Sequence, residues 1–177
     1  MCPPEAEAIA AGLAELHLEA MRSGMALGAA GTAVAGTLRR SYHEVVSTLE
    51  DARRLLFVAE RDGELLGMAQ LVFSGVGNAT HRAEVQRVAV AAASRGAGIG
   101  ARLMGALEDA ALRQGVTLLW LTTHDETAAC SFYEAIGYTK LGVMPSYSRR
   151  PDGRLWPGAF YFRDLSETGT GDRERAS

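Results

Sequence analysis

The chain has 177 residues, of which 47% are hydrophobic, and this length and composition favour one domain with a well-buried core. Its formal net charge of −3 argues against nucleic acid or an anionic membrane surface as a partner. The two cysteines, Cys2 and Cys130, have no metal-ligand spacing, which argues against a disulfide framework and a zinc site. Residues 23–38 are too few and too rich in glycine and alanine for a membrane span, and the first residues lack a signal-peptide pattern. We therefore expect a cytoplasmic protein that needs no metal.

Apolar residues recur every three or four positions near the N-terminus, which predicts two amphipathic helices, at 5–21 and 37–54. The stretch between them is rich in glycine and alanine and carries Met25 and Leu27. Such a composition is typical of a loop.

After residue 54 the pattern changes to short apolar strands that alternate with helices, as in an α/β domain. Strands are expected at 55–58, 65–73, 85–91, 116–122, 138–143 and 159–165, and helices at 99–113 and between Asp125 and Gly137. Residues 61–64 are expected to form a hairpin turn, Asp125 to cap a helix, and Trp120 to lie in the core. A proline-containing loop is expected between the last two strands, and residues 166–177 are expected to be a disordered tail.

The third expected strand is followed by three glycines at alternate positions and then by a helix, in the segment Arg95-Gly96-Ala97-Gly98-Ile99-Gly100. Glycines let the backbone approach an anion closely, and a helix N-terminus carries about half a positive charge. The segment therefore predicts a phosphate-binding turn. Its spacing differs from the G-x-G-x-x-G of dinucleotide folds, and it lacks the lysine of a Walker motif.

The pattern V-x-V-x-x-x-x-R-G-x-G-I-G-x-x-L, followed by S-F-Y-E-A-I-G-Y at 131–138, resembles the GCN5-related N-acetyltransferases (GNAT), whose donor is acetyl-CoA. More narrowly, A-E-V-Q at 83–86 and P-D-G-R-L at 151–155 are similar to the tabtoxin-resistance acetyltransferases, which modify a small toxic amino acid derivative. The resemblance implies a three-layer α/β/α fold with a mostly antiparallel, centrally splayed mixed sheet. It implies one domain, 1–165, with acceptor-side helices and a loop in 1–54 and an acetyl-CoA-binding core in 55–165.

The resemblance also implies roles for individual residues. Val88, Ala89 and Val90 would pair through their backbone groups with the pantetheine arm, and the segment from Arg95 to Gly100 would hold the pyrophosphate. The cofactor would enter between the strands that begin at Val85 and Val116. Tyr133 matches the tyrosine that returns a proton to the departing thiolate.

Glu84 is the expected base. An alkylamine with a pKa near 10 is mostly protonated at neutral pH, so a group must accept its proton before it attacks a thioester. In an extended strand Glu84 shares a face with Gln86 and Val88, on the strand that would carry the donor. The resemblance implies the same proton-accepting role for this glutamate.

Two positions depart from the relatives. Thr122 stands where they usually have an aspartate, and Glu126 stands where many members have an asparagine that touches the cofactor. Of the histidines, His17 and His43 are expected to be structural or surface residues, whereas His81 and His124 are expected near the cleft. Cys130 has no paired base and is not expected to act as a nucleophile. The late-loop residues expected to border the acceptor pocket are Tyr147, Arg149, Arg150 and Trp156.

The predicted activity is transfer of acetyl from acetyl-CoA to a primary amine of a small molecule, by direct attack in a ternary complex. Two alternatives remain open, a peptide or protein N-acetyltransferase and a non-catalytic acyl-CoA sensor, and a dinucleotide-dependent oxidoreductase fits the glycine spacing least. A homodimer is one assembly that the sequence leaves open. Residues 1–54, with Met25, Leu27 and Tyr42, are expected to set acceptor specificity.

Overall fold

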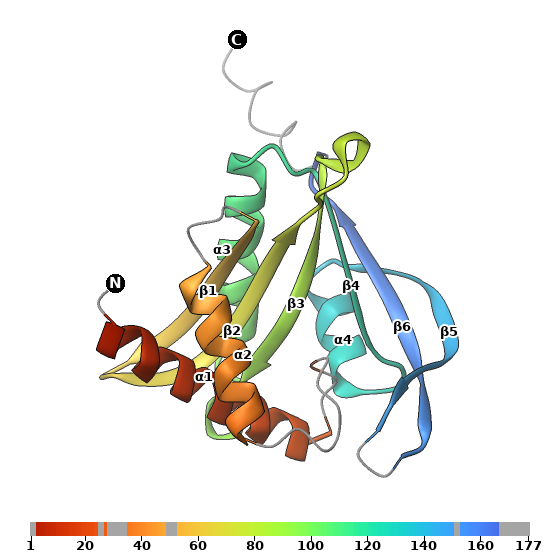
Figure 1. Cartoon of the computed structure of the whole chain (residues 1–177). Coiled ribbons are helices and arrows are strands. Elements are labelled where there is room, and N and C mark those ends of the chain that lie inside the picture. The colour runs from red at the N-terminus through yellow and green to blue at the C-terminus, as the bar shows by residue number, and fades with distance from the viewer. Residues whose placement is uncertain (1–2, 25–26, 28–34, 49–52, 151–152, 167–177) are drawn as a thin grey trace.

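The computed structural model describes residues 3–24, 27, 35–48, 53–150 and 153–166, in which one six-stranded sheet has helices on both faces (Figure 1). The elements follow the chain as α1 (Pro3–Arg22), α2 (Ala35–Ser47), β1 (Arg54–Arg61), β2 (Glu64–Phe73), β3 (Arg82–Val90), α3 (Ile99–Arg113), β4 (Leu118–His124), α4 (Ala128–Ala135), β5 (Thr139–Arg149) and β6 (Leu155–Asp164). Short 3-10 turns lie at Gly77–Ala79 and Ala92–Ser94.

The sheet is mostly antiparallel and splits at its centre. Its strand order is β1-β2-β3-β4-β6-β5, and only the β3–β4 pair is parallel. These two strands pair over one short stretch, Arg82–Glu84 against Leu118–Trp120, and then diverge, as Figure 1 shows. The predicted three-layer fold with a splayed mixed sheet is thereby confirmed.

Two apolar clusters bind the layers together. One lies between the sheet and α3 and α4, and includes Leu71, Leu107 and Leu121. The other lies between the opposite face of β1–β3 and the pair α1 and α2, and includes Leu13 and Tyr42. Each amphipathic helix thus buries its apolar face against the sheet, and this face is the one from which the sequence predicted the helix.

Most predicted elements are present, and some boundaries shift. The helix at 99–113 and the turn after Arg61 lie where the sequence placed them, and Asp62 and Gly63 adopt φ of 52° and 82° to make that turn. The predicted second helix ends earlier, at Ser47, and Arg54 already belongs to β1. The strand predicted to begin at Val116 begins at Leu118.

Three expectations about the C-terminal half were wrong. The prolines Pro145 and Pro157 lie inside the paired strands β5 and β6, so these strands are much longer than the composition suggested. Asp125 does not cap α4, whose first turn follows Thr127; it forms an ion pair with Lys140 instead. Trp120 is half-buried and lies outside both apolar clusters.

No helix in the described ranges is long and apolar enough to cross a membrane. The predicted disordered tail lies outside the described residues except for Ser166, as do Met25 and most of the predicted glycine-rich loop. Leu27 is described and is buried against the cluster under α1 and α2.

Candidate functional site

A cleft of about 980 Å³ opens where β3 and β4 separate. Its walls come from β3, from the turn before α3, from the end of β4, and from α4. Ser23 and Gly24 after the end of α1, Tyr147 of β5 and Arg150 just after β5 also line it. The cleft therefore joins segments that are far apart in sequence.

A β-bulge divides β3 in the middle of the cleft wall. Met68 of β2 pairs with Ala89, and Gln70 pairs with Gln86, so β3 has one residue more than β2 in this interval. Arg87 occupies the bulge with a φ of 52°, an uncommon value for a residue with a side chain.

The bulge changes which side chains share a face. Val85 and Val88 both pack toward α3, although they are three residues apart, and Ala89 packs toward α1 and α2. The expectation that Glu84 shares a face with Val88 was wrong, because the inserted residue reverses the alternation. Glu84 and Gln86 lie before the bulge, on the α1–α2 face.

The backbone of β3 beyond the bulge presents an edge to the cleft. The N–H of Ala91 donates to the carbonyl of Leu66 in β2, at 2.9 Å. Because backbone groups alternate along a strand, those of Ala89 also face β2, and those of Val88 and Val90 face the cleft. Of the three residues expected to pair with pantetheine, Val88 and Val90 thus have backbone groups in position to do so.

The glycine turn leads directly into α3. Gly98 is the N-cap with a φ of 75°, and Gly96 has a φ of 78°. No side chain caps the first turn of the helix, whose Ile99 and Gly100 line the cleft. Ala97, by contrast, is not among the lining residues. The turn thus presents the start of α3 to the cleft, where an anion is stabilised by the helix dipole.

Arg95 connects this turn to two other elements. Its Nε donates to the carbonyl of Val90 at 3.1 Å, and its Nη2 donates to Ser23 Oγ at 2.9 Å. The side chain is exposed and lines the cleft beside the glycines. Arg95 therefore places a fixed positive charge next to the predicted pyrophosphate site.

Tyr133 lies on α4 and lines the cleft from the α3–α4 side of the sheet. Its ring packs at 5.2 to 5.9 Å from the rings of Phe132, Tyr138 and Tyr161. Burial, with a smaller effect of Cys130, raises the pKa of the Tyr133 hydroxyl. The hydroxyl therefore keeps its proton at neutral pH and can donate it.

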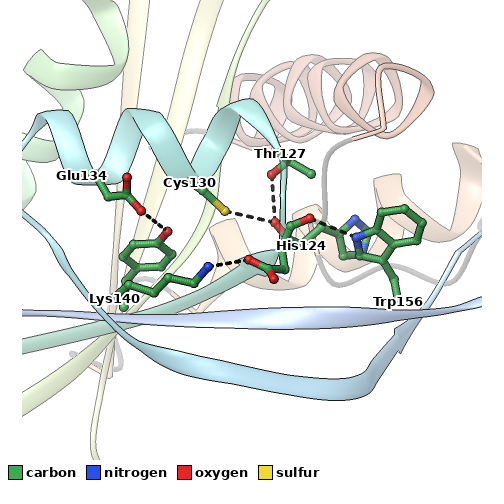
Figure 2. Close-up of polar contacts among 8 residues, drawn as sticks. His124, Thr127, Cys130, Glu134, Lys140 and Trp156 are labelled. Carbon is green, nitrogen blue, oxygen red and sulfur yellow. Dashed lines mark hydrogen bonds and ion pairs between the residues drawn. The ribbon is translucent and has the colours of Figure 1, made fainter.

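Figure 2 shows the contacts that hold α4 against the end of β4. The carbonyl of His124 accepts hydrogen bonds from Thr127 Oγ1 at 2.8 Å and Cys130 Sγ at 3.4 Å. Glu134 accepts a hydrogen bond from the Tyr161 hydroxyl at 2.8 Å, at the other end of the helix.

The ion pair between Lys140 Nζ and Asp125, at 2.6 Å, fixes the turn between β4 and α4 (Figure 2). Trp156 Nε1 donates to the carbonyl of Asp125 at 3.1 Å. Cys130 is buried, and its hydrogen bond to the carbonyl of His124 joins α4 to the end of β4.

Glu84 is half-buried at the point where the sheet divides. It is the last residue of β3 that pairs with β4, opposite Trp120, and it lines the cleft. Thr122, two residues along β4, lies on the same face and accepts a hydrogen bond from the Tyr147 hydroxyl at 3.4 Å. Glu84 and Tyr133 thus reach the cleft from opposite faces of the sheet.

Some expected residues are absent from the cleft. His81 is exposed in the connection between β2 and β3, and Glu126 lies in the turn before α4 without lining the cleft. Of the four residues expected to border the acceptor pocket, Tyr147 and Arg150 line the cleft. Arg149 instead donates a hydrogen bond to the carbonyl of Gly153 at 2.7 Å, and the ring of Trp156 packs against the Arg150 guanidinium at 3.8 Å.

His124 lies at the cleft, as the sequence indicated. It is buried at the end of β4 and lines the cleft, and burial, followed by the charge of Arg150, lowers the pKa of its imidazole. Arg87 was missed altogether, although a charged residue inside the apolar strand V-Q-R-V-A-V was a visible signal. No group of three or more metal-ligating side chains occurs within the described ranges.

Comparison with known proteins yields one family. The model of the Acetyltransferase (GNAT) family matches residues 28–138. An uncharacterized protein of Mycobacterium leprae, ML0378, is 41% identical over 64 residues, which are 36% of this chain and 17% of that protein's length.

Solved structures share the fold. A ribosomal-protein-alanine N-acetyltransferase from Brucella melitensis superposes with a TM-score of 0.74 at 24% identity, over 90% of this chain and 96% of the other. A putative acetyltransferase from Salmonella typhimurium, yncA, whose structure contains its cofactor acetyl-CoA, superposes with a TM-score of 0.74 at 22% identity, over 94% of each chain.

Proposed function

Because the chain belongs to the GNAT family of N-acetyltransferases, we propose that it transfers acetyl from acetyl-CoA to a primary amine of a small molecule, such as a toxin or an antibiotic. The observation that carries the proposal is the cleft at the split of the sheet, lined by the free edge of β3, the glycine turn and Tyr133. The narrower likeness to the tabtoxin-resistance enzymes stays a prediction.

The donor would lie along β3. Its pantetheine amides would pair with the backbone of Val88 and Val90, and its pyrophosphate would lie at the turn from Arg95 to Gly100. This places the thioester near the bulge, where β3 turns away from β4. The Salmonella structure, which contains acetyl-CoA in the same fold, supports this choice of donor.

The acceptor would enter from the α1–α2 face, on which Glu84 lies. Glu84 would accept the proton that the ammonium group loses, and the neutral amine would attack the thioester carbon. A C–N bond forms, the nitrogen releases its second proton to solvent as the amide forms, the C–S bond breaks, and the sulfur leaves with the bonding electrons. Tyr133, from the opposite face, would donate its hydroxyl proton to the thiolate and recover a proton from solvent.

The two alternatives differ in testable ways. A peptide acetyltransferase would use the same donor site, and the Brucella structure is named for a protein acceptor, so fold alone does not choose. A sensor would bind acetyl-CoA without turnover. The volume of the cleft, about 980 Å³, would also have to hold the donor, and this supports a small acceptor.

The test is thiol release from acetyl-CoA by the purified protein across amino acids, dipeptides, polyamines, aminoglycosides and N-terminal peptides. The proposal predicts turnover with a small amine, and predicts that Glu84→Gln lowers this turnover by roughly 100-fold or more without loss of acetyl-CoA binding. Turnover confined to peptides, or binding without any turnover, would contradict it.

A further inference from the structure

The bulge in β3 carries Arg87 into the wall of the cleft on the side of α2. The guanidinium lies over the ring of Tyr42, 4.8 Å from its centroid, and Nη2 donates to Ser41 Oγ at 3.4 Å. Tyr42 is itself fixed, since its hydroxyl lies 2.8 Å from His17 Nδ1. Arg87 is therefore a held cation and not a flexible surface side chain.

The charge of Arg87 has no counter-ion in the described part of the chain. Its Nη1 is buried and has no hydrogen-bond partner there, and the basic partners in the ion pairs of the described residues are Lys140 and Arg163 instead. Glu84 lines the same cleft but forms no ion pair with Arg87.

The groups packed around the guanidinium are also neutral. Burial, aided by Arg87, lowers the pKa of His17 to about 4, and burial raises the pKa of Tyr42 to about 12. A half-buried guanidinium with an unpaired nitrogen is costly unless an anion completes it.

We propose that Arg87 binds an anionic group of the acceptor, a carboxylate or an oxyanion of similar shape, and so selects amines that also carry a negative charge. This inference rests on the proposed function. The planar fork of arginine suits a two-oxygen anion, Arg87 lines the cleft, and its Nη1 has no hydrogen-bond partner among the described residues. Glu84 and Arg87, on one strand, would then receive the amine and the anion of one molecule.

The proposed anion is not the donor's pyrophosphate. The glycine turn lies beyond Val90, whereas Arg87 precedes the donor-pairing residues and packs against α2. Arg95 already supplies a cation at the turn. Cationic acceptors such as polyamines and aminoglycosides would be repelled by Arg87 and are therefore predicted to be poor substrates.

The experiment compares acceptor pairs that differ only in the anion, each amino acid against its α-carboxamide. It uses the wild-type protein, Arg87→Gln, Arg87→Lys, and the control Arg113→Gln at an exposed position in the last turn of α3. The wild-type protein should favour the carboxylate. Arg87→Gln should raise the KM for the carboxylate roughly 10- to 100-fold, the range of a charged hydrogen bond. The KM for acetyl-CoA and for the carboxamide should not change.

Arg87→Lys should retain part of the preference for the carboxylate, because lysine keeps the positive charge but lacks the planar guanidinium that can bind two oxygens at once. A wild-type protein that acetylates both members equally, or an Arg87→Gln variant that loses both equally, would overturn the inference.

Calorimetric binding of the same pairs in the presence of CoA separates this inference from the proposed function. If no amine is acetylated, the proposed function fails. The anion site would still be supported if the wild-type protein bound the amino acid more tightly than its α-carboxamide and Arg87→Gln abolished this difference. Equal binding of the two compounds, or binding of neither, would overturn it. The melting temperature of each variant checks folding.

Discussion

Two ionisable side chains, Glu84 and Tyr133, reach the cleft from opposite faces of the sheet. In the proposed mechanism the amine would therefore approach from one face, and the thiol would leave toward the other. Burial raises the pKa of the Tyr133 hydroxyl further above neutral pH, so this hydroxyl is protonated and acts as a hydrogen-bond donor rather than as a base.

Glu84→Gln should lower kcat by roughly 100-fold or more, the usual contribution of a general base. The dissociation constant of acetyl-CoA should stay the same, because the donor contacts lie beyond the bulge. Steady-state kinetics with calorimetry checks both. Equal kcat in variant and wild type would remove Glu84 from the mechanism.

Tyr133→Phe deletes one hydroxyl and leaves the ring among Phe132, Tyr138 and Tyr161. We expect a lower kcat with an unchanged melting temperature, measured by thiol release and thermal denaturation. A variant as active as the wild type would show that the thiolate obtains its proton elsewhere.

His17 makes the stability of the fold depend on pH. Its pKa is about 4 in the folded protein, against an ordinary value of 6.5, because burial disfavours the charged form and Arg87 adds to this effect. The unfolded chain therefore binds the proton first, so stability is complete above pH 6.5 and is lost as pH falls toward 4. The loss is on the order of 3 kcal/mol.

Urea unfolding between pH 4 and 7 measures this slope. His17→Gln should flatten it, and the matched control His43→Gln, at an exposed position of α2, should leave it unchanged. An unaltered slope in His17→Gln would mean that other groups cause the acid sensitivity.

At the scale of the element, the start of α3 depends on backbone conformation more than on side chains. Gly98 has a φ of 75°, and a Cβ added there would meet nothing within 4 Å. Substitution at this position therefore acts through backbone strain alone. Gly105, in the same helix, also has open space but ordinary helical geometry.

Gly98→Ala should destabilise the protein by about 1 kcal/mol and weaken acetyl-CoA binding, since the αL cap shapes the turn. Gly105→Ala should stabilise it by up to about 1 kcal/mol without changing binding. Thermal unfolding and calorimetry measure both. Equal acetyl-CoA affinity in the two variants would argue against the turn as the pyrophosphate site.

The elements themselves were largely predictable, because burial against a sheet imposes helical and strand periods on the sequence. The helix Ile99–Arg113 and the hairpin after Arg61 are examples. The long β5–β6 hairpin was not, since Pro145 and Pro157 are typical of loops and yet lie within these strands.

The candidate site was predictable in part. The glycine turn and Tyr133 came from motif spacing and a family resemblance, and both line the cleft. The bulge at Arg87 could not be predicted, because an extra residue in one strand is defined only by the register of its partner. The meeting of Gly24 and His124 in one cleft wall is likewise a tertiary feature, because these residues are far apart in the sequence.

At the scale of the whole molecule, the split sheet provides the functional opening. One apolar cluster packs α1 and α2 against β1–β3, and the other packs α3 and α4 against the opposite face of the sheet. Between these two clusters, β3 and β4 pair over only a short stretch. A ligand seated between them would replace the missing strand pairing, as β-augmentation does in peptide recognition. Acetyl-CoA is the ligand proposed for this position.

Residue-resolved amide hydrogen exchange, with and without acetyl-CoA, tests that proposal most directly. The amides of Val88 and Val90 face the cleft, whereas that of Ala89 faces β2 and is an internal control. At a donor concentration 100 times Kd, exchange at Val88 and Val90 should slow by up to about 100-fold, and more than at Ala89. Binding of acetyl-CoA that leaves Val88 and Val90 unprotected, with protection confined to other elements, would contradict the account.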